Sequence, residues 1–339
     1  MNNLQDPNST KQKIGVIGSG AWGTALAAVA AASGNNVTIW SRNTQVVADI
    51  NDKHENKLYL KGAALNPSIK ATSEIDDLSQ CNVILLVVPS QHLRNVLEAT
   101  RGKISKNIPL VLCAKGVEIT SGLLMTEMLA EVMPDNPIAV LSGPTFAIEV
   151  ASELPTAVTL ACLNEQLGKE LAQTLGSRSF RIYHSADPIG AEIGGAVKNV
   201  IAIACGIVEG RKLGDNARAA LITRGLSEIV KLGLAKGGRR ETLMGLAGMG
   251  DLTLTCTATQ SRNYALGKAL GEGTTIEDYL KGRITVAEGL SSSKSVSALA
   301  KTLKIDMPIC SAISDILHHK ADIDHTIANL LARPQKAEF

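Results

Sequence analysis

A glycine-rich hexamer near the N-terminus, GSGAWG at residues 18–23, constrains the fold more than any other stretch of this sequence. It follows a strand candidate at 13–18 and opens an alanine-rich helix candidate, Ala21–Ser33, before a second strand candidate at 36–40. In this context Gly18 permits a tight turn, Gly20 lets the backbone approach a pyrophosphate, and Gly23 lets the helix pack on the strand. The pattern predicts a dinucleotide site at a helix N-terminus; the alternative is a purely structural glycine turn.

Short apolar runs rich in β-branched residues alternate with helical stretches through the first half of the chain. Strand candidates lie at 13–18, 36–40, 82–88, 109–114, 138–143, 156–161 and 179–184, with helix candidates such as Gln91–Ala99 between them. Most of these runs lack polar alternation, as expected of strands covered on both faces. Strand–helix alternation predicts a doubly wound, Rossmann-like α/β domain with a parallel sheet.

After about residue 188 the β-branched runs become sparse, and long Ala/Leu/Gly-rich stretches with helical spacing replace them. Examples are Ala217–Leu234 and Ser291–Leu303. We therefore expect a polar N-terminal tail at 1–12, a dinucleotide-binding domain at 13–188, and a mainly α-helical substrate and catalytic domain at 189–339.

The residues that follow the second strand candidate bear on the choice of cofactor. This strand ends in TIWSRN, with Arg42 after it and no acidic residue until Asp49. A site that prefers NAD usually has Asp or Glu here for the ribose 2′-hydroxyl, whereas a guanidinium suits a 2′-phosphate. The sequence predicts NADPH as the cofactor, with NADH tolerated; the alternative is a solvated surface arginine.

Composition excludes several classes of protein. A net charge of +2 and an aromatic content of 3% argue against nucleic-acid binding. The six cysteines are spread singly and the histidines lack metal-ligand spacing, so we expect buried thiols in a reducing compartment and no bound metal. The first twelve residues lack the apolar core of a signal peptide, and the apolar run Val200–Val208 is too short to span a bilayer. These features predict a cytoplasmic protein without membrane insertion.

Several polar residues lie where parallel strands or helices are expected to end, and ligands bind beyond the carboxyl ends of such strands. Each has a plain structural alternative: Lys115 as a solvated lysine, Thr145 and Asp251 as helix caps, and Arg262 as a surface charge. Arg262 beside free backbone N–H groups would equally suit a phosphate monoester. The candidates are Lys115, Gly143, Thr145, Asp251, Ser261, Arg262 and Asn263.

Lys198 is the only charged residue from Ile193 to Val208, within GGAVKNVIAIACG. A lone lysine in such a segment often extends its ammonium group to water while its stem stays buried. The alternative is catalysis, because burial lowers the pKa of a lysine while a nearby carboxylate such as Asp251 raises it again. An amine in a dry cleft could protonate the alkoxide that forms when a hydride reaches a carbonyl.

Taken together, the motifs GSGAWGTALA, SGPTFAIEV, GGAVKNVIAI, NARAALITRGL, GLAGMGDLTLTCT, QSRN and AEG resemble those of the bacterial NAD(P)-dependent sn-glycerol-3-phosphate dehydrogenases. The resemblance runs from about Lys13 to Arg333 and implies reversible reduction of dihydroxyacetone phosphate to sn-glycerol 3-phosphate, which feeds phospholipid synthesis. It also implies a cytoplasmic homodimer. Leu243 and Ala287 depart from the family pattern, where phenylalanine and valine are more usual; both changes are apolar.

The resemblance also assigns roles to individual residues. Lys198 aligns with the lysine that carries the catalytic proton and also contacts substrate. The other substrate-contacting positions are Lys115, Gly143, Thr145, Asp251, Ser261, Arg262 and Asn263. The cofactor-contacting positions, with the glycine turn included, are Gly18, Gly20, Trp22, Gly23, Arg42, Lys115, Ala147, Arg262, Val286 and Glu288. Two alternatives remain: a hydroxyacid dehydrogenase of the same two-domain plan, and a non-catalytic NADPH sensor.

Overall fold

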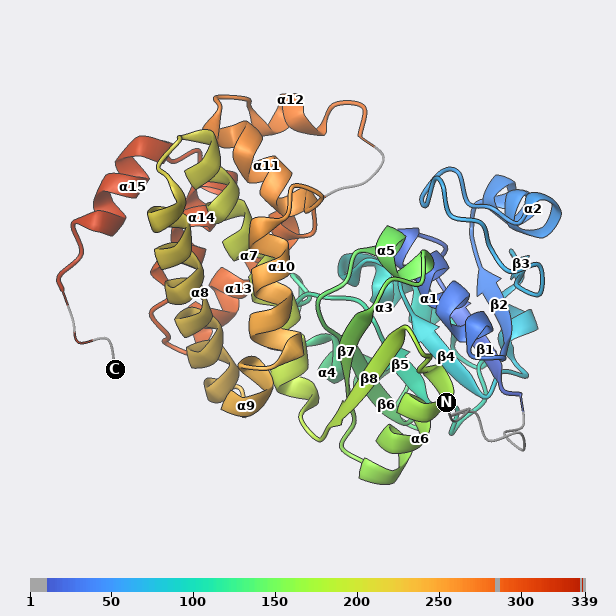
Figure 1. The fold of residues 1–339 in the computed structure, drawn as a ribbon. Helices are drawn as coiled ribbons and strands as arrows, with labels where there is room; N and C mark the ends of the chain where they lie inside the picture. Colours follow the sequence, from blue (N-terminus) through green and yellow to red (C-terminus); the bar gives the residue numbers. More distant parts are fainter. Residues whose placement is uncertain (1–10, 284–286, 336, 338–339) are drawn as a thin grey trace. The chain divides into compact units, whose positions relative to one another are not determined.

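The computed structural model describes residues 11–283, 287–335 and 337, and the chain separates into two compact units (Figure 1). The first unit contains residues 1–114, 128–141 and 145–186; the second contains 115–127, 142–144 and 187–339. The chain thus leaves the first unit at residue 115 and returns at 128, and we call residues 115–127 the crossing segment. The division of the sequence at residue 188 stays a prediction.

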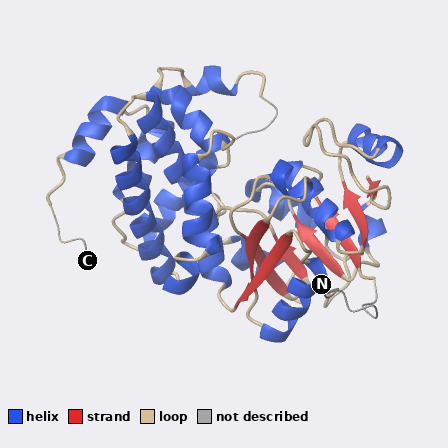
Figure 2. Ribbon diagram, viewed as in Figure 1, coloured by secondary structure: helices blue, strands red, loops and turns tan. Residues whose placement is uncertain are grey.

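The first unit is built on an eight-stranded sheet in the order β3-β2-β1-β4-β5-β6-β7-β8. Figure 2 shows the strands together with the helices that alternate with them. The strands are β1 Lys13–Ile17, β2 Asn36–Trp40, β3 Lys70–Thr72, β4 Val83–Leu86, β5 Leu110–Leu112, β6 Ile138–Ser142, β7 Thr156–Ala161 and β8 Phe180–Ser185. The helices are α1 Ala21–Ala32, α2 Thr44–Lys53, η1 Ile75–Leu78, α3 Ser90–Thr100, α4 Met125–Val132, α5 Ala147–Ala151 and α6 Glu165–Leu175.

Parallel pairing joins β1 to β2 and to β4, β2 to β3, β4 to β5, β5 to β6, and β7 to β8. The expected doubly wound, Rossmann-like sheet is therefore confirmed. From β1 the chain first adds strands on one side, β2 and β3, and then on the other side, from β4 onward. Open α/β sheets bind ligands at such a switch point, beyond the carboxyl ends of the strands. Strand β3 was missed because its three residues, KAT, carry no apolar run.

The second unit is helical. Its elements are α7 Pro188–Gly210, α8 Asp215–Ala235, α9 Arg240–Leu243, the π-helical turn η2 Leu246–Gly250, α10 Asp251–Thr257, α11 Arg262–Gly271, α12 Ile276–Leu280, α13 Gly289–Thr302, α14 Pro308–His319 and α15 Ile323–Leu331. The expected helical character of the C-terminal half is confirmed, and Ala217–Leu234 and Ser291–Leu303 fall within or beside α8 and α13.

Helix α7 is the core of the second unit, where it packs against α8, α10, α11, α13 and α14. A helix that is apolar on all sides is stable only when other elements surround it. The apolar run expected at Val200–Val208 is part of this longer helix of 23 residues. Among the described residues, α7 is the one helix long and apolar enough to cross a membrane by length and composition, and almost all of its apolar stretch is buried inside the unit.

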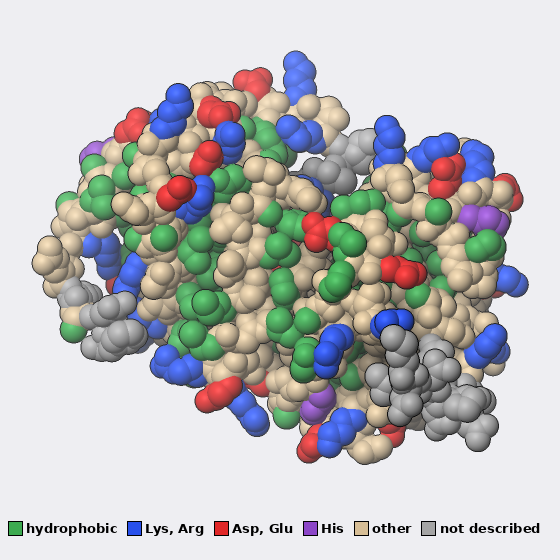
Figure 3. All heavy atoms as spheres, viewed as in Figure 1, with side chains coloured by type: hydrophobic (Ala, Val, Ile, Leu, Met, Phe, Trp, Pro, Cys, Tyr) green, Lys and Arg blue, Asp and Glu red, His purple; other side chains and the backbone are tan. Residues whose placement is uncertain are grey.

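Polar groups on the surface are mixed in sign. On the face shown in Figure 3, basic and acidic side chains lie among one another rather than gathering by sign, in keeping with the net charge of +2. All six cysteines are buried as free thiols, which confirms the expectation of buried thiols.

Helix α14 receives its N-terminal cap from a distant residue. Met307 occupies the cap position and makes no side-chain cap hydrogen bond. Instead the buried carboxylate of Glu228, on α8, accepts hydrogen bonds from the backbone N–H groups of Ile309 at 2.7 Å and Cys310 at 3.1 Å. Burial raises the pKa of Glu228, and these two hydrogen bonds act against that shift.

Glu228→Ala should lower the free energy of unfolding by about 2–4 kcal/mol, because two buried backbone donors would lose their acceptor. Urea denaturation measures the change, and the exposed Glu241→Ala on α9 serves as the control. A Glu228→Ala midpoint equal to that of the control would show that the cap contributes nothing.

Candidate active site

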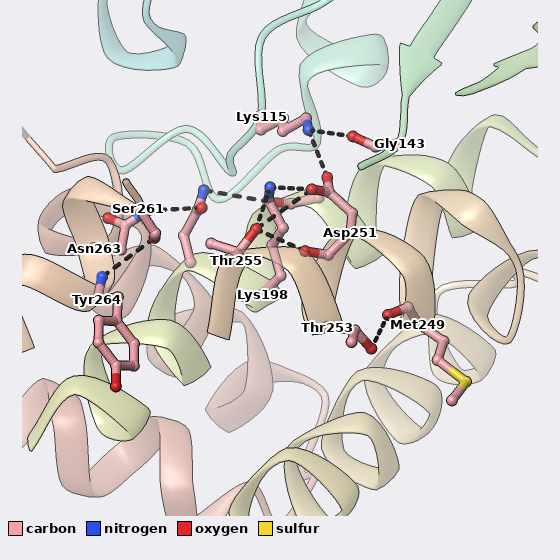
Figure 4. A network of polar contacts seen from close by, with 12 residues as sticks. Lys115, Gly143, Lys198, Met249, Asp251, Thr253, Thr255, Ser261, Asn263 and Tyr264 are labelled. Atoms are coloured by element: carbon pink, nitrogen blue, oxygen red, sulfur yellow. Dashed lines mark hydrogen bonds and ion pairs between the residues drawn. The ribbon is translucent and has the colours of Figure 1, made fainter. Parts of the chain in front are cut away.

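The buried ammonium group of Lys198 is the centre of a polar network in the second unit (Figure 4). The residue is only 6% exposed. Its Nζ donates hydrogen bonds to Asp251 Oδ1 and, at 2.8 Å, to Thr255 Oγ1. The amine therefore does not reach bulk water, and the alternative of a solvent-seeking lysine is wrong.

Asp251 joins two lysines from different parts of the chain. Its carboxylate, fully buried at the start of α10, contacts Lys198 through Oδ1 and Lys115 Nζ through Oδ2 at 2.5 Å. Lys115 Nζ also donates to the carbonyl of Gly143 at 3.4 Å. The network thus holds two ammonium groups and one carboxylate, and the expectation that Asp251 is merely a helix cap does not describe its contacts.

Local sequence explains why these groups meet. Lys115 lies three residues after the end of β5 and Gly143 follows β6 directly, so both lie at the carboxyl ends of neighbouring parallel strands. Asp251 and Thr255 lie four residues apart on α10, so they share one face of the helix. Thr255 Oγ1 in turn donates to the Asp251 carbonyl at 2.6 Å.

Apolar residues around the network keep it dry. Val197, next to Lys198, and Leu252, next to Asp251, belong to the buried core of the second unit. This burial lowers the pKa of Lys198 to about 8; the charge of Asp251 acts in the opposite direction, and the like charge of Lys115 adds to the lowering. The amine is thus suited to giving and taking a proton near neutral pH.

A second chain of hydrogen bonds runs from α7 to α11 and α13. Asn263 Nδ2 donates to Asn199 Oδ1 at 2.8 Å, and Asn263 Oδ1 accepts from the Gly289 N–H at 2.9 Å. Asn199 Nδ2 donates to the Gly195 carbonyl at 3.3 Å. The amide of Asn263 is therefore committed to internal contacts in this structure.

Ser261 and Arg262 form the N-terminus of α11. The Ser261 hydroxyl caps the helix by accepting from the Tyr264 N–H at 3.3 Å, while Arg262 is exposed at the first helical position. Free backbone N–H groups at such a terminus, together with a guanidinium, favour an anion. Burial raises the pKa of the half-buried Glu288, and the positive charge of Arg262 acts against this shift.

The glycine turn of the first unit has the shape that a dinucleotide needs. Gly18 has a φ of +117°, and a Cβ there would lie 2.7 Å from the Val87 carbonyl oxygen. A Cβ at Gly23 would lie 1.9 Å from the Gly18 carbonyl oxygen, so helix and turn require both glycines. A Cβ at Gly20 would meet no atom within 4 Å, which leaves space for phosphates at the N-terminus of α1. These residues fit a nicotinamide dinucleotide.

Arg42 is exposed beyond the end of β2 and borders a cavity of about 210 Å³. Trp40 and the α3 residues His92 and Asn95 also line this cavity.

The remaining residues predicted from the sequence as site residues are Trp22, Thr145, Ala147 and Val286. Trp22 lies half-buried in the first turn of α1, with its ring centre 6.5 Å from that of Phe180. The expectation that Thr145 caps the next helix is wrong, because α5 begins at Ala147 with Phe146 at the cap position. Val286 lies outside the described residues. Within the described ranges, no cluster of three or more His, Cys, Asp or Glu side chains could hold a metal ion.

Sequence reasoning missed Thr255 and Asn199, which complete the two hydrogen-bond chains. A signal for Thr255 was present, since it follows Asp251 by one helical turn in DLTLTC. Asn199 follows Lys198 directly, and its neighbour in space, Asn263, comes from a distant part of the chain.

Comparisons with known proteins agree along nearly the whole chain. Residues 13–168 match the family described as NAD-dependent glycerol-3-phosphate dehydrogenase N-terminus, and residues 187–328 match the corresponding C-terminus. Curated glycerol-3-phosphate dehydrogenases (NAD(P)+) from Parvibaculum lavamentivorans and Caulobacter vibrioides are 53% and 54% identical. These alignments cover 96% and 97% of this chain and 98% and 99% of the relatives.

A solved structure supports the same assignment. The crystal structure of glycerol-3-phosphate dehydrogenase from Coxiella burnetii superposes with a TM-score of 0.91 at 41% identity, covering 95% of this chain and 99% of that one. The chain therefore belongs to the NAD-dependent glycerol-3-phosphate dehydrogenase family.

Proposed function

We propose that the protein catalyses the reversible, NAD(P)H-dependent reduction of dihydroxyacetone phosphate to sn-glycerol 3-phosphate, the backbone precursor of phospholipids. The observation that carries this proposal is the buried Lys198 amine, held by Asp251 beside Lys115. A fold that only bound the nucleotide would have no need of two ammonium groups around one dry carboxylate. Membership of the family and the names of its relatives support the same substrate.

A nicotinamide dinucleotide held at Gly18, Gly20 and Gly23 would supply the hydride for the carbonyl carbon in the reductive direction. Lys198 holds the proton that the carbonyl oxygen takes up, so that the ketone becomes a secondary alcohol and Lys198 is left as a neutral amine. Asp251 and Thr255 fix the direction of that amine, and Lys115 adds positive charge where the oxyanion develops. In the oxidative direction the neutral amine accepts the proton.

The phosphate of the substrate would bind at the N-terminus of α11. Arg262 supplies a guanidinium there, and the first-turn N–H groups and the helix dipole favour a dianion. Ser261 and Asn263 contribute by shaping this terminus, since the hydroxyl caps the helix and the amide ties it to α7 and α13. Glycine at 143 and threonine at 145 are further proposed substrate contacts.

The cofactor assignment rests on the first unit. Gly18, Gly20 and Gly23 would accommodate the pyrophosphate, and Arg42 would bind a ribose 2′-phosphate, so we propose a preference for NADPH over NADH. The remaining proposed cofactor contacts are Trp22, Lys115, Ala147, Arg262, Val286 and Glu288.

We further propose that the enzyme works as a cytoplasmic homodimer. Buried free thiols suit a reducing compartment, which supports the location. The dimer is implied by the family resemblance.

The direct test follows absorbance at the reduced nicotinamide band, with purified protein, NADPH or NADH, and a panel of ketones. Oxidation with dihydroxyacetone phosphate supports the proposal. Turnover of a β-hydroxyacid or of 6-phosphogluconate instead would favour a hydroxyacid dehydrogenase, and nucleotide binding without any oxidation would favour a sensor.

Lys198→Met should lower kcat by about 10²–10⁴-fold, or roughly 3–5 kcal/mol in the barrier, because the reaction loses its general acid. Affinity for NADPH, measured by fluorescence titration, should stay nearly unchanged. A Lys198→Met enzyme with wild-type turnover would remove Lys198 from the mechanism.

The rate should depend on pH in opposite senses for the two directions. Reduction needs protonated Lys198, whose pKa is lowered to about 8, so kcat/KM for reduction should decline as the pH rises through that value. Oxidation needs the neutral amine, so its kcat/KM should rise over the same range. Profiles with the same sign in both directions would be inconsistent with this role.

Arg42→Asp should weaken NADPH binding by about 10-fold to 100-fold, since a hydrogen bond to a charged group contributes about 1.5–3 kcal/mol. NADH binding should change far less. Arg178→Asp, at another exposed arginine of the first unit, controls for the change in net charge. Equal losses for the two cofactors would refute the 2′-phosphate contact.

A further inference from the structure

Another buried carboxyl group of the second unit belongs to Glu192 on α7, less than two helical turns before Lys198. Glu192 is 4% exposed, and it accepts two hydrogen bonds from one residue: from Thr126 N at 3.0 Å and from Thr126 Oγ1 at 2.5 Å. Both residues belong to the second unit. The proposed reaction uses neither of them.

Thr126 lies near the end of the crossing segment, and Lys115 is its first residue. The two ends are thus both tied to the second unit, Lys115 through Asp251 and Thr126 through Glu192. Between them, Val117 and Leu124 form a β-bridge and join the apolar core of that unit. The position of Lys115 therefore depends on how the whole crossing segment is held.

One face of α7 meets the crossing segment at successive points. Glu192, Gly195 and Lys198 are spaced by three residues and fall within about 120° of the helix surface. Glu192 binds Thr126, and Gly195 approaches Lys115 so closely that an added Cβ would lie 3.2 Å from Lys115 Cγ. Lys198 shares Asp251 with Lys115. The same helix face carries the anchor and the proton carrier.

The Glu192 carboxyl is costly to bury. Desolvation raises its pKa to about 7, an effect that the Thr126 hydrogen bonds oppose and that the nearby charge of Glu127 increases. An apolar side chain at this position would avoid the cost but could not hold Thr126 by both its N–H and its hydroxyl.

We propose that Glu192 is a positioning residue: by binding Thr126 it fixes the crossing segment along α7 and so sets Lys115 on Asp251. The expected effect of Glu192 on turnover rests on the proposed function. The expected effect of Glu192 on the position of Lys115 rests only on the contacts described above.

Glu192→Gln tests the inference with almost no change in volume, and Glu228→Gln is a matched control. Glu228 is likewise a buried carboxyl of the second unit that accepts two hydrogen bonds, but its partners lie on α14. Glu192→Gln should lower kcat by about 10-fold to 100-fold, the range expected of a misplaced catalytic group. Glu228→Gln should keep the wild-type kcat.

Thr126 offers a pair of variants that separates position from folding. Thr126→Val removes the hydroxyl at constant shape and should lower kcat in the same way, whereas Thr126→Ser keeps the hydroxyl and should restore it. If Glu192→Gln and Glu228→Gln have the same kcat, or if Thr126→Val behaves as Thr126→Ser, the positioning role is refuted.

A second readout does not depend on turnover. Reductive methylation with formaldehyde, quantified by peptide mass spectrometry, reports how freely each lysine amine reacts. Lys115 should react slowly in the wild type and in Glu228→Gln, because its amine is paired with Asp251 and its side chain is only 15% exposed. It should react faster in Glu192→Gln.

The two readouts distinguish the two proposals. A wild-type protein that fails to reduce dihydroxyacetone phosphate, but in which Lys115 labelling still depends on Glu192, would overturn the function and keep the positioning role. Unchanged Lys115 labelling in Glu192→Gln would overturn the positioning role whatever the substrate.

Discussion

The second unit depends on one carboxylate placed between two ammonium groups in an apolar interior. Asp251 without a cation, or Lys198 without an anion, would be a costly buried charge and would be driven toward its neutral form. With Lys115 added, two ammonium groups share one carboxylate, and the surplus positive charge lies beside the buried Lys198 and Asp251. Such surplus charge is least costly when a substrate oxygen gains negative charge beside it.

This requirement explains features of the fold that would otherwise look arbitrary. The network needs a helix whose every face is covered, and α7 is surrounded by other helices of the second unit. The second oxygen of Asp251 is paired with a cation that comes from neither α7 nor α10. The crossing segment supplies that cation from the chain between β5 and β6. The assignment of the crossing segment to the second unit is thus part of how the site is built.

Sequence alone was sufficient for the parts that depend on local pattern. The glycine turn, seven of the eight strands and the helical second half follow from runs and spacings that are visible in the sequence. The lone charge in GGAVKN marked Lys198 without settling whether it met water. The contacts that decide this come from Asp251 and Thr255, which lie 53 and 57 residues from Lys198 along the chain. No periodicity reports on such pairs.

Predictions from sequence were least reliable where a residue has two uses. Ser261 was chosen for a phosphate, and its hydroxyl caps α11; Asn263 was chosen for substrate, and its amide links α7 to α13. These roles are compatible, because a capped, anchored terminus presents its remaining N–H groups in a fixed direction. Sequence identifies the residue type that a terminus needs, but not which of its atoms the fold has already used.

Three buried carboxyl groups of the second unit show how the fold distributes charge. Glu228 and Glu192 are held by neutral N–H and O–H donors, and burial raises the pKa of both. Asp251 is held by two lysines. Neutral donors stabilise a carboxylate without supplying a positive charge, so the first two groups act through the structure that they hold. Of the three, only Asp251 is paired with more positive charge than it carries negative charge. That surplus lies beside Lys198, the amine whose proton the proposed reaction needs.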